Sequence, residues 1–247
     1  MSEIDETQRG WASVSSRDWR AAEEHFRRVL EANPFDADAL TGMAALYLHV
    51  GDADQARELC EMAVAQAERD LPRARRHTTG WDDAKVRPYL RALFYLSLAY
   101  VHEEAWALAQ PALEEIVAWD VTGMGGEALN LLAQVLHRID RLDDAAHAYV
   151  EAAEYIPEAY YSAGLAYWRL GKRREAERMW RRGLERRPQL AALIVHYPRV
   201  LPNPRGGLQD PEFNRAVEYL EYLGELWDEE SKSELAHLYE RRVALNG

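Results

Sequence analysis

The feature that most constrains the fold is a regular spacing of small and aromatic residues between positions 160 and 188. The residues that define the spacing are Tyr160, Ala163, Gly164, Tyr167, Gly171, Ala176, Trp180 and Pro188. Small side chains at Gly164 and Ala176 allow two helix backbones to approach closely, and the large ring of Trp180 fills the seam beside that contact. Gly171 falls where a turn between the two helices is expected. The stretch therefore predicts a pair of antiparallel helices.

The same spacing recurs along the chain at a period of about 34 residues, which predicts a repeated helical hairpin. The copies are expected near residues 3–36, 37–70, 90–123, 126–157 and 158–188, with a loop insertion near 71–87. Beyond residue 188 the pattern is lost, and apolar periodicity on either side of a proline-rich loop near 198–210 predicts further helices. Because an open array of hairpins exposes an apolar end, we expect residues 189–247 to cap it.

The composition and charge narrow the classes of fold and function. Only 14 Gly and 10 Pro occur among 247 residues, so a chain dominated by helix-forming residues is expected to be all-α. The formal net charge of -12 argues against a general nucleic-acid binder, because such proteins need a cationic surface to displace counterions from phosphate.

The cysteine content and the N-terminal sequence bear on the compartment. Cys60 is the single cysteine, so it forms no disulfide within the chain and suits a reducing compartment. The first residues lack the positive flank and apolar run of a secretory signal, and no stretch approaches about 18 consecutive apolar residues. We therefore expect a cytoplasmic protein without a membrane span.

Three short motifs resemble catalytic or metal sites but lack a necessary part. His102, followed by Glu103 and Glu104, has no second His one turn later for zinc. The acidic pairs at 82–83 and 143–144 are adjacent residues, which point in different directions on a helix. We therefore expect no enzyme activity, no catalytic residue, no metal and no cofactor.

The repeated pattern resembles that of the tetratricopeptide repeat family. In the fifth copy Tyr160 stands where the family pattern has Trp, Ala163 where it has Leu, and Trp180 where it has Phe, and the other positions match. The resemblance implies a right-handed solenoid of about five helical hairpins with C-terminal capping helices. It further implies that the first helix of each hairpin lines a concave groove that binds a protein or peptide.

Projecting this groove onto the chain yields a mixed aromatic and amide surface. The groove residues that the resemblance implies are Arg91, Phe94, Leu98, Asn130, Gln134, His137, Tyr161 and Trp168. Family members that clamp the terminal carboxylates of chaperones use several cations, whereas only Arg91 is cationic at the matching positions, so binding of that kind is not expected. The alternative is that the capping tail, or the loop near 198–209, fills this surface.

A second candidate surface is the basic stretch from residue 169 to residue 187. It holds nine Lys or Arg against three Glu, including Arg173, Arg174, Arg178, Arg181 and Arg182, which we call the basic face. A solvated helix with internal ion pairs explains this pattern, and so does contact with an acidic partner, with RNA or with a second copy of the chain. The alternative function is therefore an accessory protein that binds nucleic acid or an acidic partner, and a more distant one is an enzyme with a site in the groove.

Overall fold

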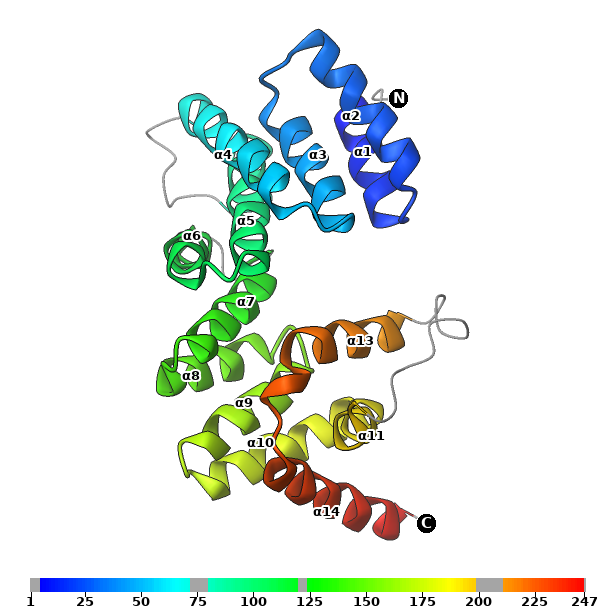
Figure 1. The fold of residues 1–247 in the computed structure, drawn as a ribbon, viewed down its shortest axis with the longest axis vertical. Coiled ribbons are helices and arrows are strands. Elements are labelled where there is room, and N and C mark those ends of the chain that lie inside the picture. Colours follow the sequence, from blue (N-terminus) through cyan, green and yellow to red (C-terminus); the bar gives the residue numbers. More distant parts are fainter. Residues whose placement is uncertain (1–4, 72–79, 120–123, 199–210, 247) are drawn as a thin grey trace. The chain divides into compact units, whose positions relative to one another are not determined.

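The computed structural model describes residues 5–71, 80–119, 124–198 and 211–246, and all regular elements in these ranges are helices (Figure 1). The chain forms two compact units, Met1–Ala128 and Leu129–Gly247, which are described separately. The prediction of an all-α fold of helical hairpins followed by further C-terminal helices is confirmed. Parts of the insertion predicted near 71–87 and of the loop predicted near 198–210 lie outside the described residues.

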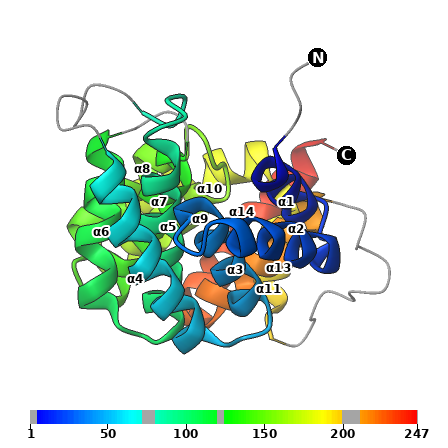
Figure 2. The same ribbon diagram turned by 90° about the horizontal axis from the view of Figure 1, so that it is seen from above.

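The N-terminal unit is built from three helical pairs. Its helices are α1 (Glu6–Ser15), α2 (Trp19–Ala32), α3 (Ala37–His49), α4 (Ala53–Asp70), α5 (Arg87–His102) and α6 (Trp106–Trp119). Each helix packs against the next one along the chain, and α1 and α2 lie side by side in both ribbon views (Figures 1 and 2). In addition α3 packs on α5, so the first helices of successive pairs are neighbours.

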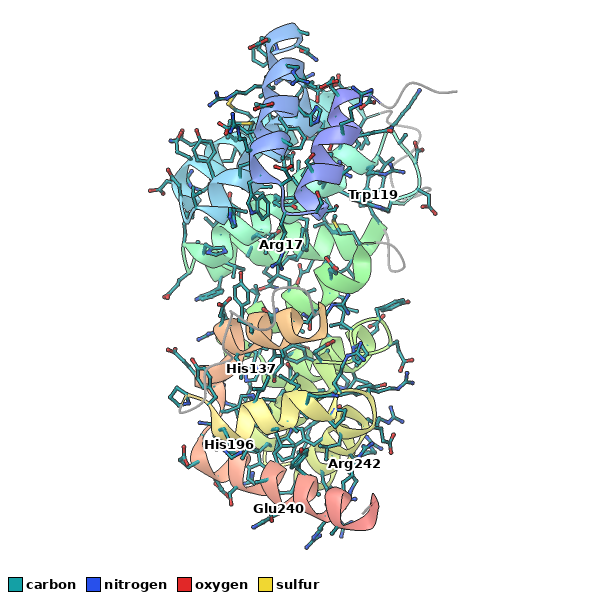
Figure 3. All side chains as sticks on the ribbon, turned by 90° about the vertical axis from the view of Figure 1, so that its right-hand side faces the viewer. Arg17, Trp119, His137, His196, Glu240 and Arg242 are labelled. Carbon is teal, nitrogen blue, oxygen red and sulfur yellow. The ribbon has the colours of Figure 1, made fainter. Side chains whose placement is uncertain are left out.

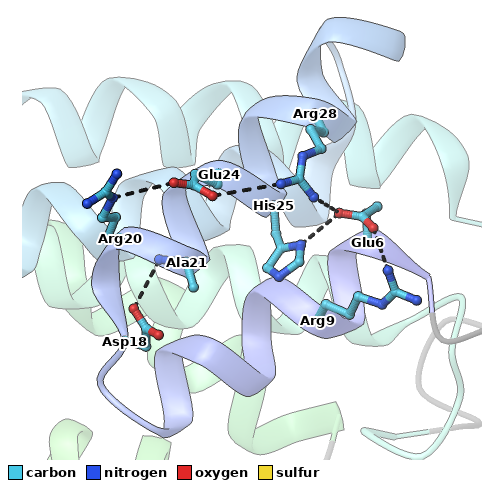
Figure 4. Close-up of polar contacts among 8 residues, drawn as sticks. All are labelled: Glu6, Arg9, Asp18, Arg20, Ala21, Glu24, His25 and Arg28. Atoms are coloured by element: carbon cyan, nitrogen blue, oxygen red, sulfur yellow. Dashed lines mark hydrogen bonds and ion pairs between the residues drawn. The ribbon is translucent and has the colours of Figure 1, made fainter.

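Aspartate residues mark where the first four helices begin. The carboxylates of Asp5, Asp18, Asp36 and Asp52 each accept a hydrogen bond of 2.8–3.1 Å from the backbone N–H three residues later. These bonds satisfy N–H groups that have no partner inside the helix. The cap at Asp18 is drawn in Figure 4, beside ion pairs that join the two helices of the first hairpin.

The C-terminal unit holds two further helical pairs and the C-terminal helices. Its elements are α7 (Gly125–Arg138, which begins before the boundary between the units), α8 (Leu142–Ala152), α9 (Ala159–Arg169), α10 (Arg173–Arg186), α11 (Pro188–His196), α13 (Pro211–Leu223), the 3-10 helix η2 (Gly224–Leu226) and α14 (Glu229–Asn246). Helix α14 packs on both α10 and α11, and thereby covers the end of the last hairpin.

The close contact predicted from Gly164 is present between α9 and α10. Trp180 is fully buried, and its indole N–H donates a 3.1 Å hydrogen bond to the backbone carbonyl of Tyr161. A Cβ atom added at Gly164 would lie 2.2 Å from the indole nitrogen of Trp180. Glycine is therefore required at this position for the ring to occupy the seam.

Phe26 of the first hairpin packs in the same way against two glycines. Phe26 is fully buried between Gly10 on α1 and Gly42 on α3. A Cβ atom at either glycine would lie within 2.5 Å of the Phe26 ring. One aromatic ring thus joins the first hairpin to the first helix of the second.

We expect Gly164→Ala to lower the free energy of unfolding by about 1–3 kcal/mol, because the added methyl group has no room beside Trp180. Helix propensity alone predicts the opposite sign, since Ala is favoured over Gly by about 1 kcal/mol inside a helix. Urea unfolding followed by circular dichroism measures the difference. A variant more stable than the parent would show that the Trp180 ring moves aside at little cost.

Candidate protein-binding surfaces

A cluster of aromatic and charged side chains lies on the first helices of the N-terminal unit. Arg91 on α5 donates a hydrogen bond from Nη1 to the carboxylate of Asp38 on α3. The Arg91 guanidinium carbon lies 4.1 Å from the ring centroid of Trp11 on α1 and 5.1 Å from that of Trp81. The ring of Trp11 is also 5.5 Å from that of Tyr95. The predicted groove cation therefore lies near two indole rings and is paired with a carboxylate.

Burial and charge act in opposite directions on Asp38. Removal of its carboxylate from water raises the pKa of Asp38, and the adjacent Arg91 cation opposes this rise without cancelling it. Both side chains are largely covered, with 12% of Arg91 and 21% of Asp38 exposed. Arg91 consequently offers little free positive charge to a ligand.

Phe94 and Leu98 follow Arg91 along α5 and are half-buried. The ring of Phe94 meets that of Tyr95 edge to face, with centroids 6.0 Å apart. Asn130 and Gln134, which the resemblance also assigned to the groove, are half-buried on α7. These four side chains keep an accessible part, so their assignment to a binding surface stays a prediction.

The other three predicted groove residues are not available to a ligand. Tyr161 is fully buried, and His137 and Trp168 are 2% and 9% exposed. The Tyr161 hydroxyl donates a 2.9 Å hydrogen bond to the backbone carbonyl of Arg187, and the Arg173 guanidinium carbon lies 3.2 Å from the Trp168 ring centroid. The expectation that His137, Tyr161 and Trp168 face an open groove was wrong, because neighbouring elements of the unit cover them.

The C-terminal segment supplies part of this cover. The Ser162 hydroxyl on α9 donates a 3.4 Å hydrogen bond to the hydroxyl of Tyr219 on α13, which also accepts one of 3.2 Å from the indole N–H of Trp227. Arg138 on α7 donates a 2.7 Å hydrogen bond to the backbone carbonyl of Tyr222. Helix α13 therefore contacts the first helices α7 and α9 through these hydrogen bonds.

His137 lies inside the C-terminal unit (Figure 3), and neither of its ring nitrogens has a hydrogen-bond partner among the described residues. Burial lowers the pKa of His137 to about 3, and the nearby cations Arg169 and Arg138 contribute. Its ring packs edge to face on Tyr149, with centroids 6.0 Å apart. His137 is therefore a neutral core residue at physiological pH.

The basic-face residues Arg173, Arg174, Arg178, Arg181 and Arg182 all lie on α10 and are exposed. Arg173 pairs with Glu230 on α14, and Arg181 pairs with Glu177 one turn earlier on α10. The acidic pair at 143–144 forms surface ion pairs with Lys172 and Arg141.

No group of three or more His, Cys, Asp or Glu that could hold a metal occurs among the described residues. Over the same part of the chain, every helix is too short or too polar to cross a membrane.

Asp38 and Trp81 were not predicted to belong to this cluster. Trp81 carried the clearest signal, since it is an aromatic residue in an otherwise polar stretch that was expected to be a loop. Asp38 pairs with a residue 53 positions later in the chain, and nothing in the local pattern of α3 indicates that partner.

Comparison with known proteins supports the repeat pattern. Two segments match models described as tetratricopeptide repeat, over residues 13–76 and 157–190. A comparison with curated proteins finds no match.

Solved structures show the same fold at low identity. Two structures of MamA are 24% and 23% identical to the chain, cover 74% and 80% of it and 96% of MamA in each case, and both have a TM-score of 0.55. YrrB, described as a TPR protein with an unusual peptide-binding site, is 20% identical, covers 72% of this chain and 83% of its own, and has a TM-score of 0.53.

We expect the stability of the protein to fall as the pH drops from about 6.5 to about 3. The unfolded chain binds a proton at His137 with the ordinary pKa of about 6.5, whereas the folded chain resists it, so acid favours unfolding by up to about 1.4 kcal/mol per pH unit. Urea unfolding between pH 7 and pH 4 should show a shallower loss in His137→Phe. His49→Phe, at an exposed position on α3, is the control and should keep the parent slope. Equal slopes in the two variants would contradict the prediction.

Ending the chain at Asp210 removes α13 and α14 and should expose Trp180, whose ring lies 5.5 Å from that of Trp227. We expect loss of the cooperative thermal transition and aggregation, because an apolar hairpin surface is left in water. Light scattering and dye binding to exposed apolar surface measure both effects. A truncated chain that stays monomeric with the parent melting temperature would show that the C-terminal helices add no stability.

Proposed function

We propose that the chain, two segments of which match tetratricopeptide repeat models, is a non-catalytic scaffold that binds another protein or a peptide. We further propose that the binding surface is formed by α1, α3 and α5 of the N-terminal unit. YrrB, which is described as a TPR protein with a peptide-binding site, supports a ligand of this class.

The choice of surface rests on a difference in the accessibility of side chains on the first helices of the two units. In the C-terminal unit α13 forms hydrogen bonds with α7 and α9, and three of the predicted groove residues are buried. In the N-terminal unit Phe94 and Leu98 keep half-exposed apolar side chains on α5. Aromatic and aliphatic side chains that remain accessible beside a rigid helix suit a peptide or a partner helix.

The charge of this surface indicates which part of a partner it binds. Arg91 is paired with Asp38 and lies over the rings of Trp11 and Trp81, so no free cation among these residues faces a terminal carboxylate. Apolar side chains of the ligand would supply most of the contact area. Such binding should depend only weakly on salt, whereas contacts with phosphate weaken steeply as salt rises.

Photo-crosslinking can test the surface before the partner is identified. We expect benzoylphenylalanine at Phe94 or Leu98 to capture a partner in cells of the source organism. The same group at Met62 on α4 or Leu108 on α6, which are exposed on second helices, should not capture it.

The specificity of that capture can be tested with one further substitution. Leu98→Asp should reduce capture at position 94 by about tenfold, while Leu108→Asp should leave it unchanged. Circular dichroism of both variants controls for folding. Equal capture from all four positions would contradict the proposed surface.

A further inference from the structure

The basic residues between positions 169 and 187 fall into two classes in the structure. Five of them form ion pairs with carboxylates of the same unit: Arg169 with Asp140, Lys172 with Asp143, Arg173 with Glu230, Arg181 with Glu177 and Arg187 with Glu158. The remaining four, Arg174, Arg178, Arg182 and Arg186, are exposed and form no ion pair with any described residue. Internal pairing thus neutralises one part of the basic stretch and leaves the other part unpaired.

The four unpaired arginines share one side of α10. They occur at every fourth position, so successive members lie about 6 Å apart and the row is about 18 Å long. Arg182 also lies near the ring of Tyr160, with its guanidinium carbon 5.8 Å from the centroid. Glu185 is exposed three residues after Arg182, near the C-terminal end of the same side. We call this set of four the arginine row.

A row on a helix fixes the spacing of the Cα atoms from which its guanidinium groups extend. A second helix with carboxylates at every fourth position repeats at the same interval of about 6 Å. Guanidinium and carboxylate groups form paired hydrogen bonds in a planar geometry, which a row of this kind can make several times with one partner. The geometry therefore matches an acidic helix along its length.

The charge of the rest of the C-terminal unit decides between classes of anionic partner. The stretch 169–187 carries a formal charge of +6, whereas the rest of the C-terminal unit holds 16 acidic and 8 basic residues, a formal charge of -8. A long polyanion such as nucleic acid extends beyond a row of about 18 Å and meets that negative charge. A short acidic helix can lie on the row alone.

We propose that the arginine row of α10 is a docking surface for an acidic α-helix of another protein, with carboxylates at every fourth position. The row belongs to a different helix from α1, α3 and α5, so it adds a second contact to the proposed scaffold. Exposed ion pairs are individually weak, and binding should therefore be modest and should weaken as salt rises.

The test uses two synthetic helical peptides of about 18 residues, stapled on one side to hold the helix. In the first, Glu occurs at every fourth position, and in the second the same residues are rearranged so that the Glu side chains surround the helix. Fluorescence anisotropy at about 50 mM and about 300 mM salt measures binding. We expect the first peptide to bind at least about tenfold more tightly than the second at low salt, and to be released at high salt.

Matched variants distinguish peptide binding at the arginine row from an effect of net charge. Arg174→Gln/Arg178→Gln/Arg182→Gln should weaken binding of the first peptide by about tenfold or more. The control Arg20→Gln/Arg27→Gln/Arg28→Gln makes the same change of charge at exposed, ion-paired arginines of α2 and should bind as the parent does. Circular dichroism and thermal melting confirm that both variants are folded.

Several outcomes would overturn the proposal. Unchanged binding in the row variant would show that the peptide does not bind at the row. Equal losses in both variants would show that binding depends on net charge alone. Tighter binding of a single-stranded RNA oligonucleotide than of the first peptide, lost in the row variant, would assign the row to nucleic acid. Self-association in sedimentation velocity without peptide, lost in the same variant, would assign it to a second copy of the chain.

Discussion

The packing of both units depends on aromatic rings that fit against glycine. Trp180 occupies the space that a side chain at position 164 would need, and Phe26 does the same against Gly10 and Gly42. The arrangement brings helix backbones close together and buries a large apolar surface in one place. Around these contacts the remaining core positions are filled mostly by Ala and Leu.

The contact between Gly164 and Trp180 was predictable because both partners lie within one hairpin and their spacing follows the repeat. The all-α fold follows from equally local signals, namely the helix-forming composition and the spacing of the repeat. The burial of His137, Tyr161 and Trp168 was not predictable in this way. Part of their surroundings comes from distant segments, as the hydrogen bond between Ser162 and Tyr219 shows, and the local pattern of α9 contains no sign of that partner.

The difference between the two units also explains why a repeat register alone is a poor guide to a binding surface. The register places Phe94 and Tyr161 at comparable positions on first helices, yet Phe94 is half-exposed and Tyr161 is fully covered. Position within the hairpin sets which way a side chain points. Whether that side is open depends on what the rest of the chain places there, which the repeat pattern does not encode.

The position of Phe26 between two hairpins has a consequence for how the N-terminal unit comes apart. Its ring contacts α1 through Gly10 and α3 through Gly42, so separating the first hairpin from the second uncovers a ring that both of them bury. Fraying of the first hairpin is thereby coupled to loosening of the second. The smallest segment that opens cooperatively in this unit is accordingly larger than a single repeat.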